Sequence, residues 1–429
     1  MSGYIKRITN ITYNPEKQYE SDASYCSESE ASDSGSILSE SDTETIDISG
    51  KSIHDNSPHD NIRKDINTYI TNPIQKTHCM QLVDEHERDP NSNQSNLAIL
   101  KIIISINSHS SLIDNKKYDR NELVTYLNGI WDTMQESTFG HNIVKNNIIE
   151  YVATRAMGIN NQKILSLCGP PGIGKTTLIM KGLSKALGLP FCQVSLGGLR
   201  DSTFFSGSQR YWKSACQGLF ADILEKYGPN CVVYLDEIDK VSSDNDIAIY
   251  GYLTHALDPL TNNNIMDQYL GIGLDLSGIT FILSFNEESN ISKPLLDRSN
   301  IMYLTDFNIQ QKINIITDYL LPDVLKLHNI EQSLMSISPE AAKFLAEILS
   351  ENEGVRRHKQ ILNNIVNKII ISMIGNKSSF NNLANKCSKL KIKASKKSSA
   401  PKARYDSLFN KSLNLPYIIN VNDIKLVSR

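Results

Sequence analysis

The sequence GPPGIGKT at residues 169–176 has the residue types and spacing of a phosphate-binding loop. Its glycines allow a tight turn whose backbone N–H groups point into one concavity, where the dipole of a following helix adds positive potential. Lys175 supplies a charge for the β- and γ-phosphates, and Thr176 supplies a hydroxyl for Mg²⁺. We therefore expect a nucleoside triphosphate here, in contact with Gly169, Pro170, Pro171, Gly172, Ile173, Gly174, Lys175, Thr176 and Thr177.

Three polar residues follow two later apolar segments and complete this chemistry. CVVYLDE, residues 231–237, ends in Asp236, expected to hold Mg²⁺ through water, and Glu237, expected to act as general base on the attacking water. The alternative is that both carboxylates only cap the next helix. TFILSFN, residues 280–286, ends in Asn286, whose amide is expected to contact the γ-phosphate or the water, although an asparagine there is often only a turn residue.

The elements that must position these side chains alternate between apolar strands and helical segments from residue 162 to residue 306. Continuous apolar strands separated by helices predict a parallel sheet covered on both faces, which is an α/β fold. After Asn308 the pattern is wholly helical and predicts a small all-α lid subdomain. The expected strands are KILSLC, FCQVSL, CVVYLDE, TFILSFN and IMYLT.

The two ends of the chain are more polar. The serine-rich, acidic N-terminal region predicts disorder, either as a solvated tail or as a phosphorylatable segment that recruits a basic partner. LAILKIIISI at residues 97–106 is expected to be a buried strand or helix, and LPYIINVNDIKLV near the C-terminus an extra strand pair. The expected division is a disordered tail at 1–95, a helical linker at 96–160, a nucleotide-binding subdomain at 161–307, a helical lid at 308–376 and a Lys/Ser-rich linker with a C-terminal segment at 377–429.

Composition and overall charge set limits on the class of protein. A formal net charge of −3 over 429 residues gives no overall attraction to nucleic acid or acidic membranes. The seven cysteines form no CxxC pair, no secretory signal begins the chain, and no apolar run is long enough to span a bilayer. These features predict an intracellular protein in a reducing compartment, neither secreted nor membrane-bound. Heavy use of Asn, Ile and Lys fits an AT-rich genome and suggests a large DNA virus or a parasite.

Together these motifs resemble the AAA+ ATPases, and in particular the ATPase module of Lon proteases, over about residues 121–368. GPPGIGKT and YLDEIDK are shared widely among AAA+ proteins. The stretches that resemble Lon in particular are SLGGLRD, ALDPLTNNNIMDQYLGIGLDLSGITFILSFN, PLLDR and ENEGVRR. The resemblance implies that ATP with Mg²⁺ is the ligand and that the chain forms a ring, most simply a homohexamer.

The resemblance also assigns roles to residues that the chemistry alone leaves as surface ion pairs or packing residues. Arg298 in PLLDR matches the arginine finger that reaches the ATP of the neighbouring subunit, and Arg356 in GVRR matches the sensor arginine of the lid. Phe139 and Gly140 match the segment that contacts the adenine, although the usual His-Tyr-Gly is Thr138-Phe139-Gly140 here. Both arginines thus join the predicted catalytic set with Lys175, Glu237 and Asn286.

A pore loop is implied at GSQRYWKSACQG, residues 207–218. Trp212 matches the aromatic residue that grips unfolded polypeptide in the channel of Lon-type rings, with Tyr211 and Lys213 beside it. An aromatic pair next to a lysine also suits stacking on single-stranded nucleic acid, and the remaining alternative is a core tryptophan.

The expected function is therefore ATP hydrolysis that drives unfolding or remodelling of a polypeptide. No segment resembles the serine–lysine peptidase site of Lon proteases, because Ser398 and Ser399 stand among lysines in a stretch too polar for it. We expect no intrinsic proteolysis. The alternatives are a nucleic-acid remodelling ATPase, an ATPase subunit that works with a separate protease, and a scaffold or switch that binds ATP with scarcely any turnover.

Overall fold

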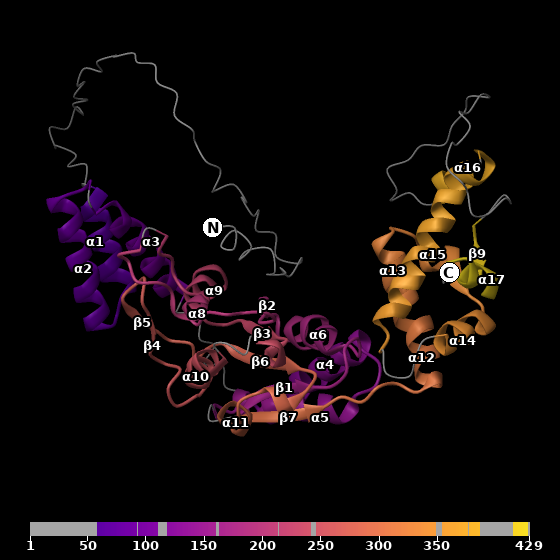
Figure 1. The fold of residues 1–429 in the computed structure, drawn as a ribbon, viewed down its shortest axis with the longest axis horizontal. Coiled ribbons are helices and arrows are strands. Elements are labelled where there is room, and N and C mark those ends of the chain that lie inside the picture. The colour runs from indigo at the N-terminus through magenta and orange to yellow at the C-terminus, as the bar shows by residue number, and fades with distance from the viewer. Residues whose placement is uncertain are drawn as a thin grey trace, which may run out of the picture.

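The computed structural model is elongated, with an N-terminal group of helices at one end, an α/β domain in the middle and the lid at the other end (Figure 1). The residues that it describes are 58–91, 93–109, 118–159, 163–212, 214–241, 246–348, 354–375, 377–386 and 415–427. Within these ranges no helix combines the length and apolar character needed to cross a membrane.

A five-stranded parallel sheet forms the centre of the α/β domain, in the order β2-β3-β6-β1-β7. The strands are β1 (Ile164–Cys168), β2 (Phe191–Ser195), β3 (Val232–Asp236), β6 (Thr280–Phe285) and β7 (Ser299–Tyr303). The register pairs Cys168 of β1 with Phe285 of β6, and Ser195 of β2 with Asp236 of β3. Because the strands are parallel, the residues that follow them meet at one edge. The predicted α/β fold is confirmed.

Alternation along the strands divides the apolar side chains between two cores. Leu165 and Leu167 of β1 face one core, and Ile164 and Cys168 face the other. The first core contains α4, which packs on η3, and extends into the lid. The second core contains the N-terminal helices, of which α3 packs on α9. Helices on the first side are α4 (Arg120–Ser137), α5 (Asn142–Ala156), α6 (Lys175–Thr177), the π-helical turn η3 (Leu178–Ser184) and α7 (Lys185–Leu187). Elements on the second side are α8 (Thr203–Ser206), α9 (Leu219–Tyr227), η4 (Ile238–Lys240), α10 (Asp246–Ala256), η5 (Glu288–Asn290), α11 (Lys293–Asp297) and the hairpin of β4 (Ile265–Asp267) and β5 (Ile272–Leu274).

The N-terminal helices correct the prediction that residues 1–95 are disordered. α1 (Pro58–Tyr69), α2 (Pro73–Arg88) and α3 (Gln94–His109) pack on one another, and α3 packs on α9. Sparse apolar residues at helical spacing, such as Ile66, Leu82 and Ile103, are fully or almost fully buried in this group. Their burial against the α/β domain offsets the entropy that composition alone leaves uncompensated. Residues 1–57, with the serine-rich acidic stretch, lie outside the described residues.

The lid is mostly helical, but it contains a small parallel sheet that the sequence did not predict. Its elements are α12 (Ile309–Ile315), η6 (Ile316–Leu320), α13 (Leu321–Leu327), η7 (Gln332–Leu334), β8 (Met335–Ile337), α14 (Pro339–Glu347), α15 (Arg356–Gly375), α16 (Lys377–Lys386), β9 (Tyr417–Ile419) and α17 (Val421–Val427). β8 pairs with β9, and α17 packs on α14 and α15. The expectation of an all-α lid and of a C-terminal strand pair is therefore wrong: the segment supplies one strand and one helix, because burial of Ile419 and Ile424 fixes it on the lid.

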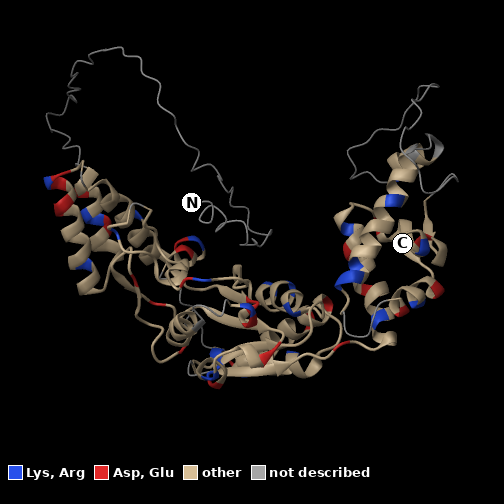
Figure 2. Cartoon of the chain, in the orientation of Figure 1, with Lys and Arg blue, Asp and Glu red and all other residues tan. Residues whose placement is uncertain are grey.

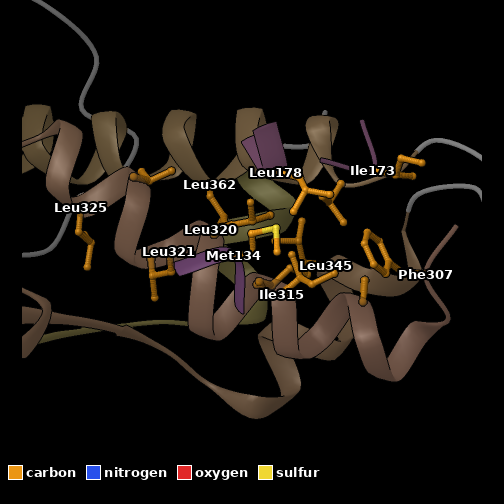
Figure 3. Close-up of a cluster of buried hydrophobic side chains, with 14 of the residues drawn as sticks. Met134, Ile173, Leu178, Phe307, Ile315, Leu320, Leu321, Leu325, Leu345 and Leu362 are labelled. Atoms are coloured by element: carbon orange, nitrogen blue, oxygen red, sulfur yellow. The ribbon is translucent and has the colours of Figure 1, made fainter. Parts of the chain in front are cut away.

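The α/β domain and the lid share a hydrophobic cluster. Met134 of α4 and Leu178 of η3 lie with Ile315 and Leu320 of the lid, as the close-up shows (Figure 3). Basic and acidic residues occur in both parts (Figure 2), so neither part presents a surface of a single charge sign along its ribbon. Burial of the shared apolar side chains contributes to holding the α/β domain and the lid together around the nucleotide cavity.

Candidate nucleotide-binding site

The predicted phosphate loop joins β1 to α6 and borders a cavity of about 600 Å³. At Gly174 the backbone has φ +97°, a left-handed conformation that side chains disfavour, just before the helix begins. The cavity is large enough for a nucleotide. Of the predicted residues, it is lined by Phe139, Pro171, Gly172, Ile173, Gly174, Lys175, Thr176, Thr177, Asp236, Glu237, Asn286 and Arg356, while Gly140, Gly169 and Pro170 do not line it.

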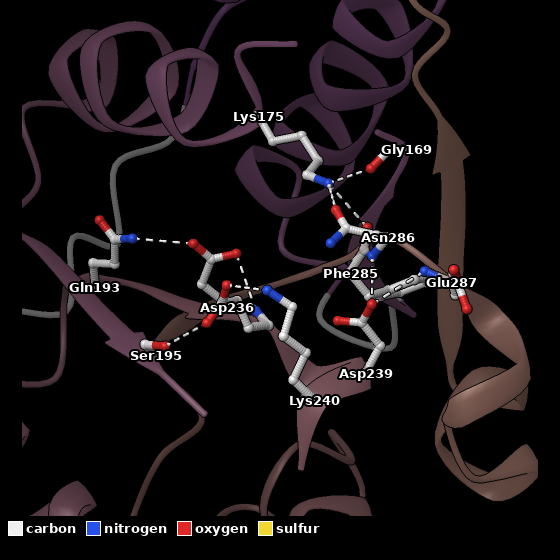
Figure 4. A network of polar contacts seen from close by, with 11 residues as sticks. Gly169, Lys175, Gln193, Ser195, Asp236, Asp239, Lys240, Phe285, Asn286 and Glu287 are labelled. Atoms are coloured by element: carbon white, nitrogen blue, oxygen red, sulfur yellow. Dashed lines mark hydrogen bonds and ion pairs between the residues drawn. The ribbon is translucent and has the colours of Figure 1, made fainter. Parts of the chain in front are cut away.

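Lys175 belongs to the polar network drawn in Figure 4 and is only 9% exposed. Its Nζ donates to Asn286 Oδ1 at 2.7 Å, to the Phe285 carbonyl at 3.0 Å and to the Gly169 carbonyl at 2.5 Å. Burial lowers the pKa of its ammonium. A buried ammonium whose partners are mainly neutral oxygens gains strongly from a nearby anion, which suits phosphate binding.

Asp236 ends β3, lines the same cavity as Lys175 and is partly buried. Its Oδ2 accepts from Gln193 Nε2 at 3.1 Å, and burial raises the pKa of its carboxyl group. Thr176 lines the same cavity, and its Oγ1 lies 3.5 Å from Tyr234 Oη. One carboxylate and one hydroxyl, together with phosphate oxygens and water, are the ligands that Mg²⁺ usually takes in nucleotide sites. The residues present therefore fit a magnesium ion.

Glu237 follows Asp236 with φ +59°, in the left-handed region. A non-glycine residue there costs about 1–3 kcal/mol, and such strain gathers at functional sites. Its carboxylate accepts from Ser195 Oγ at 3.1 Å and from Lys240 Nζ at 2.5 Å. The Lys240 hydrogen bond lowers the pKa of Glu237, which keeps its carboxylate ionised.

Asn286 is held in place by an acidic residue that the sequence analysis did not single out. Asp239 Oδ2 accepts from the backbone N–H of Asn286 at 3.0 Å and of Glu287 at 3.2 Å (Figure 4). Two hydrogen bonds to one carboxylate oxygen fix the chain where β6 ends. They aim the amide of Asn286 at Lys175, so the polar end of β6 meets the lysine of the phosphate loop.

The opposite end of the cavity is aromatic. Phe139 follows α4 and meets Phe307 and Tyr319 edge to face, with ring centroids 6.4 and 6.2 Å apart. Lys145 is fully buried and donates to the Thr138 carbonyl at 2.6 Å, which secures the chain before Phe139. An aromatic wall on the same cavity as a phosphate loop suits a flat, apolar base.

The lid approaches the phosphate loop closely. A Cβ atom at Gly354 would lie 2.5 Å from the Pro171 carbonyl oxygen, so only glycine fits here. The next residue, Val355, donates its backbone N–H to the Gly172 carbonyl at 3.0 Å. This contact places Arg356, the first residue of α15, at the cavity wall, exposed toward the space between lid and loop.

An ion-pair bridge also joins the lid to the helix that follows the phosphate loop. Asp323 of α13 accepts from Lys181 of η3 at 2.9 Å and from Lys359 of α15 at 3.0 Å. Burial alone would raise the pKa of Asp323, but the two lysines bring it below its ordinary value. Asp323 and Lys359 both line the cavity, and sequence spacing gave no signal of either.

Other predicted residues lie outside the cavity. Arg298 pairs with Asp258 through Nε at 2.8 Å and does not line the cavity of its own chain. Tyr211 and Trp212 are 73% and 60% exposed, with ring centroids 5.0 Å apart, so Trp212 is not a core residue. Lys213 lies outside the described residues.

Comparison with protein families decides what kind of domain this geometry belongs to. Residues 165–307 match the model of the ATPase family associated with various cellular activities (AAA). These residues form an AAA domain. The matched range runs from the strand before the phosphate loop to Phe307 beside the aromatic wall, so most of the cavity residues fall within the AAA domain.

The chain is also similar to Lon proteases, as the motifs predicted, over stretches longer than the AAA domain. The Lon protease of Mycoplasma mobile is 38% identical over 219 residues, which are 51% of this chain and 26% of that protein. The Lon protease of Clostridioides difficile is 32% identical over 240 residues, 56% of this chain and 30% of that protein.

A mitochondrial Lon protease homolog of Yarrowia lipolytica is 34% identical over 247 residues, 57% of this chain and 21% of that protein. The matched stretches thus span between about a fifth and a third of the length of these three curated relatives. The relatives are bacterial and fungal, and they give no support to a viral origin.

Proposed function

We propose that this chain is a Lon-like AAA+ ATPase that binds ATP with Mg²⁺ and hydrolyses it. The observation that carries the proposal is the meeting of Lys175, Asp236 and Asn286 at one edge of the sheet, on a single cavity with the phosphate loop. The AAA domain and the similarity to Lon proteases support the same activity.

In this proposal each residue has a defined task. Lys175 leaves its backbone acceptors to bind the β- and γ-phosphates, and Asn286 contacts the γ-phosphate or the attacking water. Thr176 and Asp236 hold Mg²⁺, which neutralises charge on the phosphates when bound. Glu237 takes the proton of the attacking water, since its carboxylate is ionised and borders the cavity. Phe139 stacks near the base, and Arg356 approaches the phosphates from the lid.

We further propose that the active form is a homo-oligomeric ring, with six subunits as the simplest case. Arg298 lies outside the cavity of its own chain and is 40% exposed on its side chain, which supports action on a neighbouring subunit's ATP. An arginine supplied in trans typically accelerates phosphoryl transfer about 10³- to 10⁵-fold. On this basis Arg298→Ala abolishes turnover and leaves ATP binding intact.

The substrate of the ring is proposed to be an unfolded polypeptide, gripped by Tyr211 and Trp212. Two large aromatic rings exposed side by side support a gripping role, because large aromatic residues are mostly buried. The same pair also suits stacking on single-stranded nucleic acid, which is the rival that the experiment must separate. The proposal includes no peptidase activity, because the sequence around Ser398 and Ser399 is too polar for a peptidase site.

The test is steady-state ATP hydrolysis by the purified chain alone, with an unfolded protein and with single-stranded DNA. Glu237→Gln controls for contaminating ATPases. Stimulation by unfolded protein that disappears in Trp212→Ala supports the polypeptide motor. Stimulation by DNA alone, falling steeply with salt, moves the protein to the nucleic-acid motors. Very slow turnover under all conditions favours an ATP-binding scaffold instead, and cleavage of the unfolded protein contradicts the absence of peptidase activity.

A further inference from the structure

Arg298 is held on both its main chain and its side chain. It follows α11 directly, and its carbonyl accepts from the Ile164 N–H at 3.0 Å, which ties it to the start of β1. Its Nε donates to Asp258 Oδ2 at 2.8 Å, and its Nη1 donates to the Pro294 carbonyl at 3.1 Å. The guanidinium group therefore has a set direction in a single subunit.

Asp258, the partner of Arg298, is itself held by hydrogen bonds. Its side chain is 15% exposed, and its Oδ1 accepts from the Leu260 N–H at 3.0 Å. Its carbonyl accepts from the N–H groups of Thr261 and Asn262 at 3.0 and 2.9 Å. Burial alone would raise the pKa of Asp258, but the Arg298 hydrogen bond brings it below the ordinary value, so the carboxylate stays charged. The three backbone N–H groups thus hold Asp258 in a turn from which its Oδ2 faces Arg298.

The contact leaves most of the guanidinium group available. A guanidinium carries five N–H donors, and the recorded contacts use one on Nε and one on Nη1. A phosphate needs a pair of neighbouring donors, and a carboxylate that gripped two of them would compete with it. Asp258 engages Nε alone, so it orients the group without covering the donors on Nη2.

We infer that Asp258 is the positioning residue of the arginine finger, acting on the neighbouring subunit's ATP through Arg298. This inference rests on the in-trans role proposed above. It goes beyond that role because it names a residue that never meets the nucleotide and yet sets the rate of its hydrolysis.

Mixed rings test the inference, because they separate the subunit that gives the finger from the subunit that hydrolyses. Arg298→Ala subunits have an intact site and no finger, while Glu237→Gln subunits have a finger and no general base. We expect the mixture to regain activity about tenfold or more above either variant alone, since a finger is worth about 10³- to 10⁵-fold. A Glu237→Gln, Asp258→Ala double variant should fail as the finger donor.

Asp275 provides the matched control. It makes the same kind of turn, with Oδ1 accepting from the Ser277 N–H at 2.9 Å, and no recorded ion pair of the described residues includes it. Glu237→Gln, Asp275→Ala should therefore donate the finger as well as Glu237→Gln alone. Asp258→Asn, which keeps an oxygen acceptor, should restore part of the donation. ATP affinity of each double variant, measured with a fluorescent analogue, should equal that of Glu237→Gln, because the donor's own cavity is untouched.

The outcomes separate the two hypotheses. If Glu237→Gln subunits do not rescue Arg298→Ala subunits, the in-trans finger is wrong and the inference falls with it. If the Asp258 and Asp275 double variants rescue equally, the finger stands and Asp258 has no positioning role. Greater rescue by the Asp258 double variant overturns the inference in the other direction, because Asp258 would then restrain the finger.

Discussion

The two walls of the nucleotide cavity are built differently. On the α/β side, Lys175 and Asn286 stand where a helix begins and a strand ends, and each is fixed by several hydrogen bonds. On the lid side, Arg356 is exposed, and Asp323 and Lys359 meet through ion pairs that solvent reaches. The polar groups of the α/β wall are therefore set before a nucleotide arrives, whereas the charged side chains of the lid wall are held by ion pairs that are individually weak.

The largest effect on ATP binding is expected at the α/β wall, from Lys175→Ala. The substitution removes the only lysine of the phosphate loop, so ATP binding should fall about 100-fold or more, as for loss of a charge-assisted contact in a buried site. Binding of a fluorescent ATP analogue measures this. Lys185→Ala, an exposed lysine further along the same helical run, is the control. Equal affinities for the two variants would show that the loop does not hold the phosphates.

Glu237→Gln should separate binding from chemistry on the same wall. The amide keeps the size of the side chain but cannot accept a proton, so hydrolysis should fall about 10²- to 10⁴-fold. ATP affinity should change little, because Lys175 and the loop are intact. Single-turnover hydrolysis and equilibrium binding give the two values. A parallel loss of both would mean that Glu237 supports the structure of the site and not the reaction.

At the lid wall, Arg356→Ala is expected to slow hydrolysis about tenfold, a smaller effect than that of Glu237→Gln, because an exposed arginine adds charge stabilisation without proton transfer. Arg357→Ala is the matched control, since this neighbouring arginine does not line the cavity. The steady-state hydrolysis rates of the two variants at saturating ATP measure this difference. If the Arg356 change has no effect, or the Arg357 change an equal one, the assignment of the sensor arginine is wrong.

The smallest effect is expected from Asp323→Asn, which weakens the ion pairs to Lys181 and Lys359. ATP affinity should fall only a few-fold, and high salt should reduce the difference from the unaltered chain. Because the pKa of Asp323 is lowered in the folded state, its contribution to stability is present above about pH 4, the ordinary value, and is lost as pH falls through the lowered pKa.

Thermal unfolding across that acidic range measures the Asp323 contribution. The difference between Asp323→Asn and the unaltered chain should be constant near neutral pH and shrink as the pH falls below about 4. A difference that grows on acidification would reverse the sign of the argument. It would mean that the carboxyl group is stabilised in its protonated form.

The same contrast explains what the sequence could predict. The loop, the acidic strand end and Asn286 were readable because parallel strands bring their carboxyl ends together, so order along the chain gives position in space. The five strands of the sheet were predicted for a separate reason: each is an apolar run that ends in a turn or helix signal.

Contacts between distant segments were not readable. Asp239 holds Asn286, and Asp258 holds Arg298, across separations of 47 and 40 residues that no periodicity connects. The helices α1 and α2 were missed because their few apolar residues are decisive only when a partner surface is present. Asp323 was missed because a charged residue on a helix is ordinarily solvated.

The pairing of β8 with β9 has a consequence for the order in which the protein matures on the ribosome. The last strand of the central sheet ends at Tyr303, so the α/β domain has its full sheet long before residues 417–419 are synthesised. Until then β8 lacks its only recorded strand partner among the described residues. Domains fold as units during synthesis, starting from the N-terminus. The nascent chain should therefore acquire a phosphate loop early and complete the lid above it last.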